Sequence, residues 1–168
     1  MKNLVTVIIM VISSLLSFGQ NTIDKDVIFE STKNKDLLYT NAKMFIAENF
    51  KSANDVIQLD DKENGVILVK GVVSENIVVA VQSLTYYFSF TMKIMVKDNK
   101  YRIIIENIEN TISPYYNTLL INNFRGSMKD GIHKSKYEEL MLKLSTSIDN
   151  IVKTFESSMN KDGVNIDW

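Results

Sequence analysis

The chain has 168 residues, 45% of them apolar and 23% charged, with six glycines and one proline, a composition typical of one globular domain and unlike that of disordered or collagen-like chains. The formal charge of −1 gives the whole chain no long-range attraction to nucleic acid or to an anionic membrane. The absence of cysteine excludes disulfides, thiolate nucleophiles and zinc–thiolate sites, and a single histidine leaves little imidazole chemistry.

The first nineteen residues have the features of a secretory signal peptide. Lys2 precedes an apolar run from Leu4 to Leu16, and small residues at positions 17 and 19 precede Gln20. The run is shorter than the roughly 20 residues that span a membrane, although a retained anchor is the alternative interpretation. We therefore predict a signal peptide over 1–19 and a single domain over 20–168. We expect the protein to be soluble, periplasmic or secreted, without a lipid, and without a membrane span after cleavage.

The first half of this domain is predicted to hold a strand, a helix and a hairpin. Residues 26–30 have the apolar content of a strand, and polar capping residues follow at positions 32, 34 and 36. Apolar side chains at helical spacing then predict a helix to about residue 50: Leu38, Ala42, Phe45, Ile46 and Phe50. Two apolar runs on either side of Asn64 and Gly65 predict an antiparallel hairpin, because both residues tolerate positive φ.

The next segment has mixed signals and then a regular alternation. Residues 74–83 are predicted to be a longer connection or an irregular edge strand. Apolar and polar side chains alternate from Phe88 to Val96, and again from Tyr101 to Ile105 after a turn at Asp98 and Asn99. A second hairpin is therefore expected, with one buried and one wet face. The wet face should carry Tyr87, Ser89, Thr91, Lys93, Met95 and Lys97, with Arg102, Ile104 and Glu106 beside them.

A long helix is predicted near the C-terminus. Apolar residues keep helical spacing from Tyr137 to Met159, and Ser135 with Glu138 fits a capping box at its start. The order strand, helix, four strands in two hairpins and helix indicates an α+β fold with both helices on one face of an antiparallel sheet.

Several of these segments resemble a group of exported bacterial proteins that carry a domain of unknown function with a TATA-binding-protein-like (TBP-like) fold. The resemblance rests on the N-terminal segment ending in SFGQ, the helix LLYTNAKMFIAENF, the hairpin VIQLDDKENGVILVKG and the pair FTMKIMVKDNKYRIIIENI. Members of the group often have a tryptophan where Phe45 stands here. The resemblance implies the fold, with strand, helix, four strands and helix, and it implies no activity; fold similarity to a DNA-bending protein does not carry DNA binding with it.

Candidate catalytic and metal-binding groups each have a simpler structural interpretation. His133 has Ser127, Asp130, Ser135 and Glu138 near it in sequence, without a nucleophile motif. Carboxylates that could bind calcium cluster in the first hairpin, yet they lack EF-hand spacing: Asp60, Asp61 and Glu63. A glycosidase-type pair could be drawn from Asp60, Glu106 and Glu109, at a separation that the sequence does not fix. We expect no catalytic residue, no metal and no cofactor.

A nucleic-acid site could use basic and aromatic side chains near the second hairpin: Lys93, Lys97, Lys100, Arg102, Tyr87 and Tyr101. The net negative charge, the two arginines in the chain and the expected export argue against it. Lysines on a solvent-facing strand also protect a sheet from unwanted edge pairing.

The segment from Thr111 to Ile132 is the strongest binding candidate in the sequence. It carries a heavy apolar load for a connection, and the side chains that we single out are Tyr115, Tyr116, Phe124, Arg125 and Lys129. The alternative is that the segment folds onto the core. We predict a non-catalytic binding or interaction domain for an unknown protein or envelope ligand; the alternative is a cell-envelope hydrolase with paired carboxylates on the hairpins.

Overall fold

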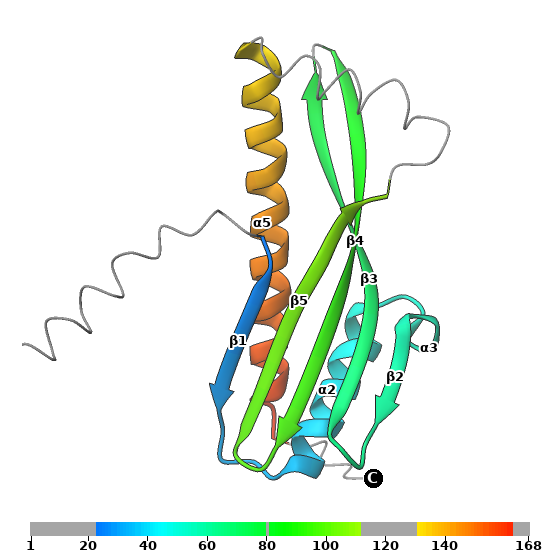
Figure 1. The fold of residues 1–168 in the computed structure, drawn as a ribbon, viewed down its shortest axis with the longest axis vertical. Coiled ribbons are helices and arrows are strands. Elements are labelled where there is room, and N and C mark those ends of the chain that lie inside the picture. Colours follow the sequence, from blue (N-terminus) through cyan, green and yellow to red (C-terminus); the bar gives the residue numbers. More distant parts are fainter. Residues whose placement is uncertain (1–22, 80, 112–130, 163–168) are drawn as a thin grey trace, which may run out of the picture.

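The computed structural model describes residues 23–79, 81–111 and 131–162, which form one antiparallel sheet and its helices (Figure 1). The strands are β1 (Lys25–Glu30), β2 (Ile57–Asp61), β3 (Val66–Val79), β4 (Gln82–Lys97) and β5 (Lys100–Asn110). The helices are α2 (Lys35–Asn49), the short α3 (Ala53–Val56) and α5 (Gly131–Met159). The α+β class expected from the sequence is therefore confirmed.

The strands lie in the order β1-β5-β4-β3-β2, and every neighbouring pair is antiparallel. Antiparallel pairing of each strand with the next places β2, β3, β4 and β5 side by side, and β1 then joins the outer edge of β5. The turns form where the sequence predicted them, with Gly65 at φ 68° and Asn99 at φ 62°. Gly65 is required there, since a Cβ would lie 2.3 Å from the backbone oxygen of Val96.

Helices α2 and α5 pack on the same face of the sheet, as predicted (Figure 1). Helix α2 begins at the cap Asn34, whose side-chain oxygen accepts a hydrogen bond from the Leu37 amide at 2.9 Å. Its apolar stripe meets α5 and the sheet in one core, where Phe155 packs edge-to-face on Phe45 and on Tyr101, with ring centroids 5.2 and 5.7 Å apart. This aromatic cluster joins both helices to the centre of the sheet.

The prediction for residues 74–83 is wrong, because the two central strands run through this segment without a break. Strand β3 pairs with β4 as far as Val79 opposite Gln82. Short hairpin connections favour glycine, asparagine or aspartate, whereas the sequence between these two strands is Ala80-Val81. Glu75 further obscures the alternation, because its side chain faces α5 and accepts a hydrogen bond from Ser147.

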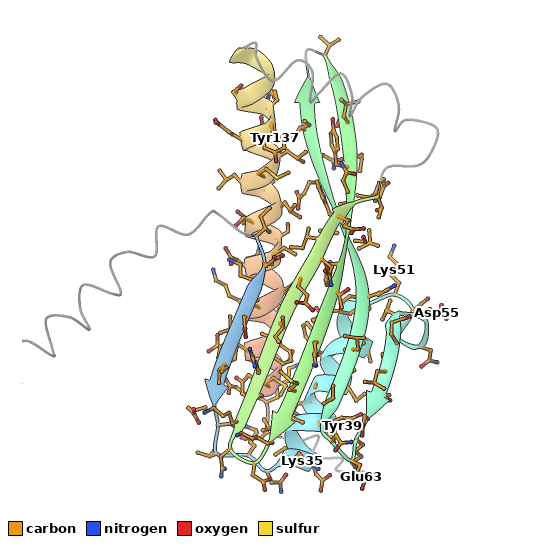
Figure 2. All side chains as sticks on the ribbon, in the orientation of Figure 1. Lys35, Tyr39, Lys51, Asp55, Glu63 and Tyr137 are labelled. Atoms are coloured by element: carbon orange, nitrogen blue, oxygen red, sulfur yellow. The ribbon has the colours of Figure 1, made fainter. Side chains whose placement is uncertain are left out.

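We call the outer part of this long hairpin the arm, which comprises residues 74–79 of β3 and 82–87 of β4. Strand β2 reaches only Val69 of β3, and β5 reaches only Phe88 of β4, so the arm extends beyond both neighbours (Figure 1). The N-terminal half of α5 runs beside it, with Tyr137 on this part of the helix (Figure 2). The described chain thus has a five-stranded body and a two-stranded arm.

The start of the last helix also differs from its prediction. Helix α5 begins at Gly131, one turn before the expected cap, so Ser135 and Glu138 lie inside it. Serine is only moderately unfavourable within a helix, and a capping-box pattern can therefore occur away from a helix end. In the described ranges, no helix is long and apolar enough to span a membrane.

Candidate binding surface on the open face of the sheet

The open face is the side of the sheet opposite α2 and α5. Its central part confirms the predicted surface, because the register sets Thr91 beside Glu106, Lys93 beside Ile104 and Met95 beside Arg102. Phe88, Phe90, Met92, Ile94 and Val96, the residues between them on β4, are all buried on the other side. The alternation that predicted one wet face is therefore present in the structure.

The open face is wider and more apolar than the sequence indicated. Strands β1, β2 and β3 add side chains to it, and five of the exposed apolar residues belong to this face: Ile28 (54% exposed), Leu59 (46%), Val72 (61%), Val78 (53%) and Tyr87 (49%). Leu59 of β2 lies opposite Leu68 of β3, and Leu68 lies opposite Lys93 of β4. Lys93 in turn lies opposite Ile104 of β5, so the four side chains form one row across the face. Apolar side chains that share one exposed face make this side of the sheet the candidate binding surface.

Ion pairs tie the β1 edge of this face to β5. The Arg102 guanidinium donates to both carboxylate oxygens of Asp26, from Nε at 2.7 Å and from a terminal nitrogen at 2.5 Å, and Lys100 Nζ lies 2.7 Å from Glu30. The hydrogen bond from Arg102 lowers the pKa of Asp26 below its ordinary value. These cations are therefore engaged within the sheet, while Lys93 lies between two apolar neighbours.

Of the three carboxylates proposed for a hydrolytic pair, Asp60 lies on the helix side of the sheet, whereas Glu106 and Glu109 lie on the open face. Asp60 pairs with Ile67 on the helix side, where it accepts hydrogen bonds from the Tyr39 hydroxyl and from Lys43 Nζ, the latter at 2.5 Å. Those bonds lower the pKa of Asp60, and burial together with Asp60 raises the pKa of Tyr39. Glu106 pairs with Thr91 on the open face. Asp60 and Glu106 therefore cannot flank one scissile bond.

The calcium candidates are also separated by the strand. Asp61 follows Asp60 on β2 and points to the opposite face, where it accepts bonds from the Asn64 amide at 2.9 Å and from Asn64 Nδ2 at 2.8 Å. The Glu63 backbone oxygen accepts from Lys35 Nζ at 2.8 Å, in the region where Figure 2 shows Lys35 and Glu63 near Tyr39. Across the described ranges, no three acidic, histidine or cysteine side chains gather where they could hold a metal.

The nucleic-acid candidates are likewise divided between the two faces. Tyr101 is 2% exposed and stacks on Phe29 inside the core, with centroids 4.9 Å apart, whereas Tyr87 lies on the open face. A single-strand binder needs basic and aromatic side chains on the same surface. The structure does not bring this set together.

A shallow depression between α2 and the end of α5 has a structural explanation. It is lined by Asn41, Met44, Ser158, Lys161 and Asp162. The buried Asn41 donates from Nδ2 to the backbone oxygens of Met159 at 3.1 Å and Lys161 at 2.8 Å. It therefore satisfies carbonyl groups at the C-terminus of α5, which a helix leaves without partners.

The remaining sequence candidates fall outside the described part of the chain. They are Tyr115, Tyr116, Phe124, Arg125 and Lys129, together with Ser127, Asp130 and the side chain of His133. The binding role expected of the first five residues stays a prediction. By contrast, Ile28 and Leu59 were not predicted from the sequence as exposed residues of this face. The only sequence signal for their exposure was period-two alternation in two short strands.

Comparisons with known proteins agree with this fold. A family model described as a domain of unknown function (DUF4468) with TBP-like fold matches residues 25–111, from β1 to the end of β5. A DUF4468 family protein from Bacteroides ovatus ATCC 8483 is 13% identical with a TM-score of 0.58, over 84% of this chain and 88% of that chain. A TBP-like protein from Parabacteroides distasonis ATCC 8503 is 13% identical with a TM-score of 0.56, over 86% and 98%.

Such low identity shows a shared fold alone. No curated protein matches the chain. The family model nevertheless spans more than half of the sequence, and the resemblance expected from the sequence is confirmed. The chain therefore belongs to the DUF4468 family, a domain of unknown function with a TBP-like fold.

Proposed function

We propose that this protein is an exported, non-catalytic binding domain that holds its partner on the open face of the sheet. The observation that carries the proposal is the group of exposed apolar side chains on that face, above all Ile28, Leu59 and Val72. While these apolar side chains stay in water, the protein lacks the stabilisation that burial of their area would give, about 25 cal/mol per Å². A partner that covers it recovers this stabilisation.

The mixed chemistry of the face indicates a protein or another envelope component with both apolar and charged groups. Lys93 stands between Leu68 and Ile104, so a partner that packs on the two apolar side chains places an acceptor within reach of the ammonium. Central apolar contacts with a charged group to fix the register are typical of protein interfaces. Residues 115–129 stay a predicted second contact.

Aspartate substitutions on the open face test the proposal. We expect Ile28→Asp and Leu59→Asp each to weaken capture of the partner from periplasmic extract by at least about tenfold, because a carboxylate would be buried without a partner. Leu142→Asp is the matched control, since Leu142 is 69% exposed on α5. Equal loss in all three variants, or no loss in either face variant, would contradict the proposed surface.

Export and the lack of catalysis have tests of their own. The mass of the protein recovered from the periplasm should correspond to a chain that begins at Gln20, and a chain that keeps residues 1–19 would overturn the proposed cleavage.

Glu106→Gln and Asp60→Asn should leave any measured envelope-degrading activity of the preparation unchanged. Activity abolished by one of these substitutions would favour the hydrolase alternative.

A further inference from the structure

The cations of the open face fall into two groups. Lys100 and Arg102 form ion pairs with Glu30 and Asp26 at the β1 edge. The side chains of the others form no ion pair or hydrogen bond with any described residue, and they are Lys70, Lys93 and Lys97. An ammonium group gains little from aliphatic neighbours, so these three groups are available to an anionic partner.

The three free cations lie along the middle of the face. Lys93 and Lys97 are four residues apart on β4, so a strand rise of about 3.3 Å per residue separates their Cα atoms by about 13 Å. Met95 lies between them on the same side of the strand. Lys70 of β3 lies opposite Thr91 and therefore diagonally next to Lys93. Cationic and aliphatic side chains thus alternate along the centre of the sheet.

The free carboxylates of the face lie elsewhere, on β5 toward the arm. Glu106 lies opposite Thr91, and Glu109 lies opposite Ser89. No described residue forms an ion pair with either carboxylate. A surface of one sign, such as a bilayer of anionic lipids or the phosphates of a nucleic acid, would meet these acids as well as the lysines. A protein can place charges of both signs at separate positions, so the pattern favours a protein partner.

The backbone of the sheet determines which secondary structure can cover the face. Strand β4 has hydrogen-bonded neighbours on both sides over residues 88–95, so the centre of the face offers side chains and no free backbone groups. An α-helix pairs its backbone groups internally and needs only side-chain contacts with a surface. Helices α2 and α5 cover the opposite face of the same sheet in this way, and helices on both faces of a sheet are a common layered architecture.

We propose that the open face binds an amphipathic helix of a partner protein, with acidic side chains beside the apolar stripe of that helix. This inference rests on the proposed function and adds the chemistry of the partner. The apolar stripe packs on Leu59, Leu68 and Ile104, and two carboxylates of the helix reach Lys93 and Lys97. Residues seven apart in a helix lie on the same side at about 10.5 Å, and the long side chains of lysine and glutamate cover the difference from about 13 Å.

Two synthetic peptides of about 20 residues, long enough to form a helix, give the most direct test. Both have leucines at helical spacing, and the leucines are flanked by glutamates in one peptide and by lysines in the other. We expect the glutamate peptide to bind the protein with a Kd at least about tenfold lower than that of the lysine peptide, measured by isothermal titration calorimetry. Equal Kd values, or no binding of the glutamate peptide at about 1 mM, would overturn the proposal.

Charge reversal locates the contact. The double substitution Lys93→Glu and Lys97→Glu should invert the preference, so that the lysine peptide binds more tightly than the glutamate peptide. Lys153→Glu is the matched control, because Lys153 is exposed on α5 and its side chain has no ion pair among the described residues. A loss of preference in the control as well would assign the preference to the overall charge of the protein and contradict the proposed contact. If the double variant does not fold, Lys97→Glu alone, at an exposed side chain, carries the same test with a smaller shift.

Two further measurements separate the acidic helix from its alternatives. Vesicles of phosphatidylglycerol should not retain the protein in sedimentation; retention that is lost in the double lysine variant would indicate a lipid surface and overturn the helical partner. Capture from periplasmic extract separates the chemistry of the partner from the place where it binds. Loss of capture in Ile28→Asp and Leu59→Asp, with capture unchanged in the double lysine variant, would leave the open face as the binding surface and contradict only the acidic partner.

Discussion

The body and the arm share two strands and differ in how they are held. In the body, both sides of the central strands have hydrogen-bonded neighbours, and two helices and an aromatic cluster cover one face. Among the described residues, the two strands of the arm pair with each other and are joined to α5 by the shared core and by polar bonds from Lys143 and Ser147. Local stability follows such differences in buried contact, so the arm should open more easily than the body.

The two regions also offer different kinds of contact. The body presents side chains on a flat face, so that its recognition depends on their chemistry. The arm presents backbone groups of β4 along an edge, and its Tyr87 side chain extends the open face beyond the body.

The largest expected effect is the removal of the aromatic centre of the body. Phe155 is fully buried between Phe45 and Tyr101, so Phe155→Ala leaves a cavity that these rings cannot fill. We expect the free energy of unfolding to fall by about 3–5 kcal/mol, measured by denaturant unfolding. A loss below about 1 kcal/mol would show that the two helices and the sheet do not share one core.

A smaller loss is expected where the body meets the arm. Gly71 lies opposite Phe90, and a Cβ on it would be 2.3 Å from the Cζ atom of that ring. Gly71→Ala should therefore cost about 1–3 kcal/mol in unfolding free energy. With Phe90→Leu in the background, the alanine should cost less, because the ring is gone; an equal cost in both backgrounds would point to a backbone cause instead.

Loosening the arm alone should have a weaker global effect. Lys143→Met removes the bond to the Asn76 carbonyl and the ion pair of 3.2 Å with Glu139, both exposed. We expect less than about 1 kcal/mol of global destabilisation, with faster amide exchange confined to residues 74–87. Faster exchange across the body as well would show that the arm and body open as one unit.

Acidification should give the smallest change. The pKa of Asp60 is lowered, first by the hydrogen bond from Lys43 and then by that from Tyr39. A carboxyl with a lowered pKa adds stability that is present above its ordinary pKa of 3.8 and is lost as the pH falls through the folded pKa. The unfolding free energy should thus decline slightly below about pH 4, and Asp60→Asn should reduce that decline. If the unfolding free energy of Asp60→Asn declines as much as that of the wild type, other carboxylates cause the decline.

The sequence predicted the body better than the arm, for identifiable reasons. Turn residues Gly65 and Asn99 marked both body hairpins, and period-two alternation placed Lys93, Ile104 and Arg102 on one face. The arm turn has no such residue, and Glu75 faces a helix where alternation predicts an apolar side chain. The orientation of Glu75 depends on a contact with α5, which is distant in sequence, so the local residue pattern could not predict it.

The candidate surface was predictable only in part. The β4 and β5 rows of the open face follow from alternation within adjacent strands. The ion pair from Asp26 to Arg102 depends on β1 joining β5, a pairing between strands 76 residues apart at this position. The length of the arm depends on where β5 ends, and the sequence around Asn110 does not mark that end.

Amide hydrogen exchange of the mature protein tests the contrast between body and arm most directly. Residues 92–96 and 101–105 should exchange slowly, whereas residues 74–79 and 83–87 should exchange faster, because fewer hydrogen-bonded strands and buried contacts hold them. Equally slow exchange in the two regions would contradict the independent opening of the arm.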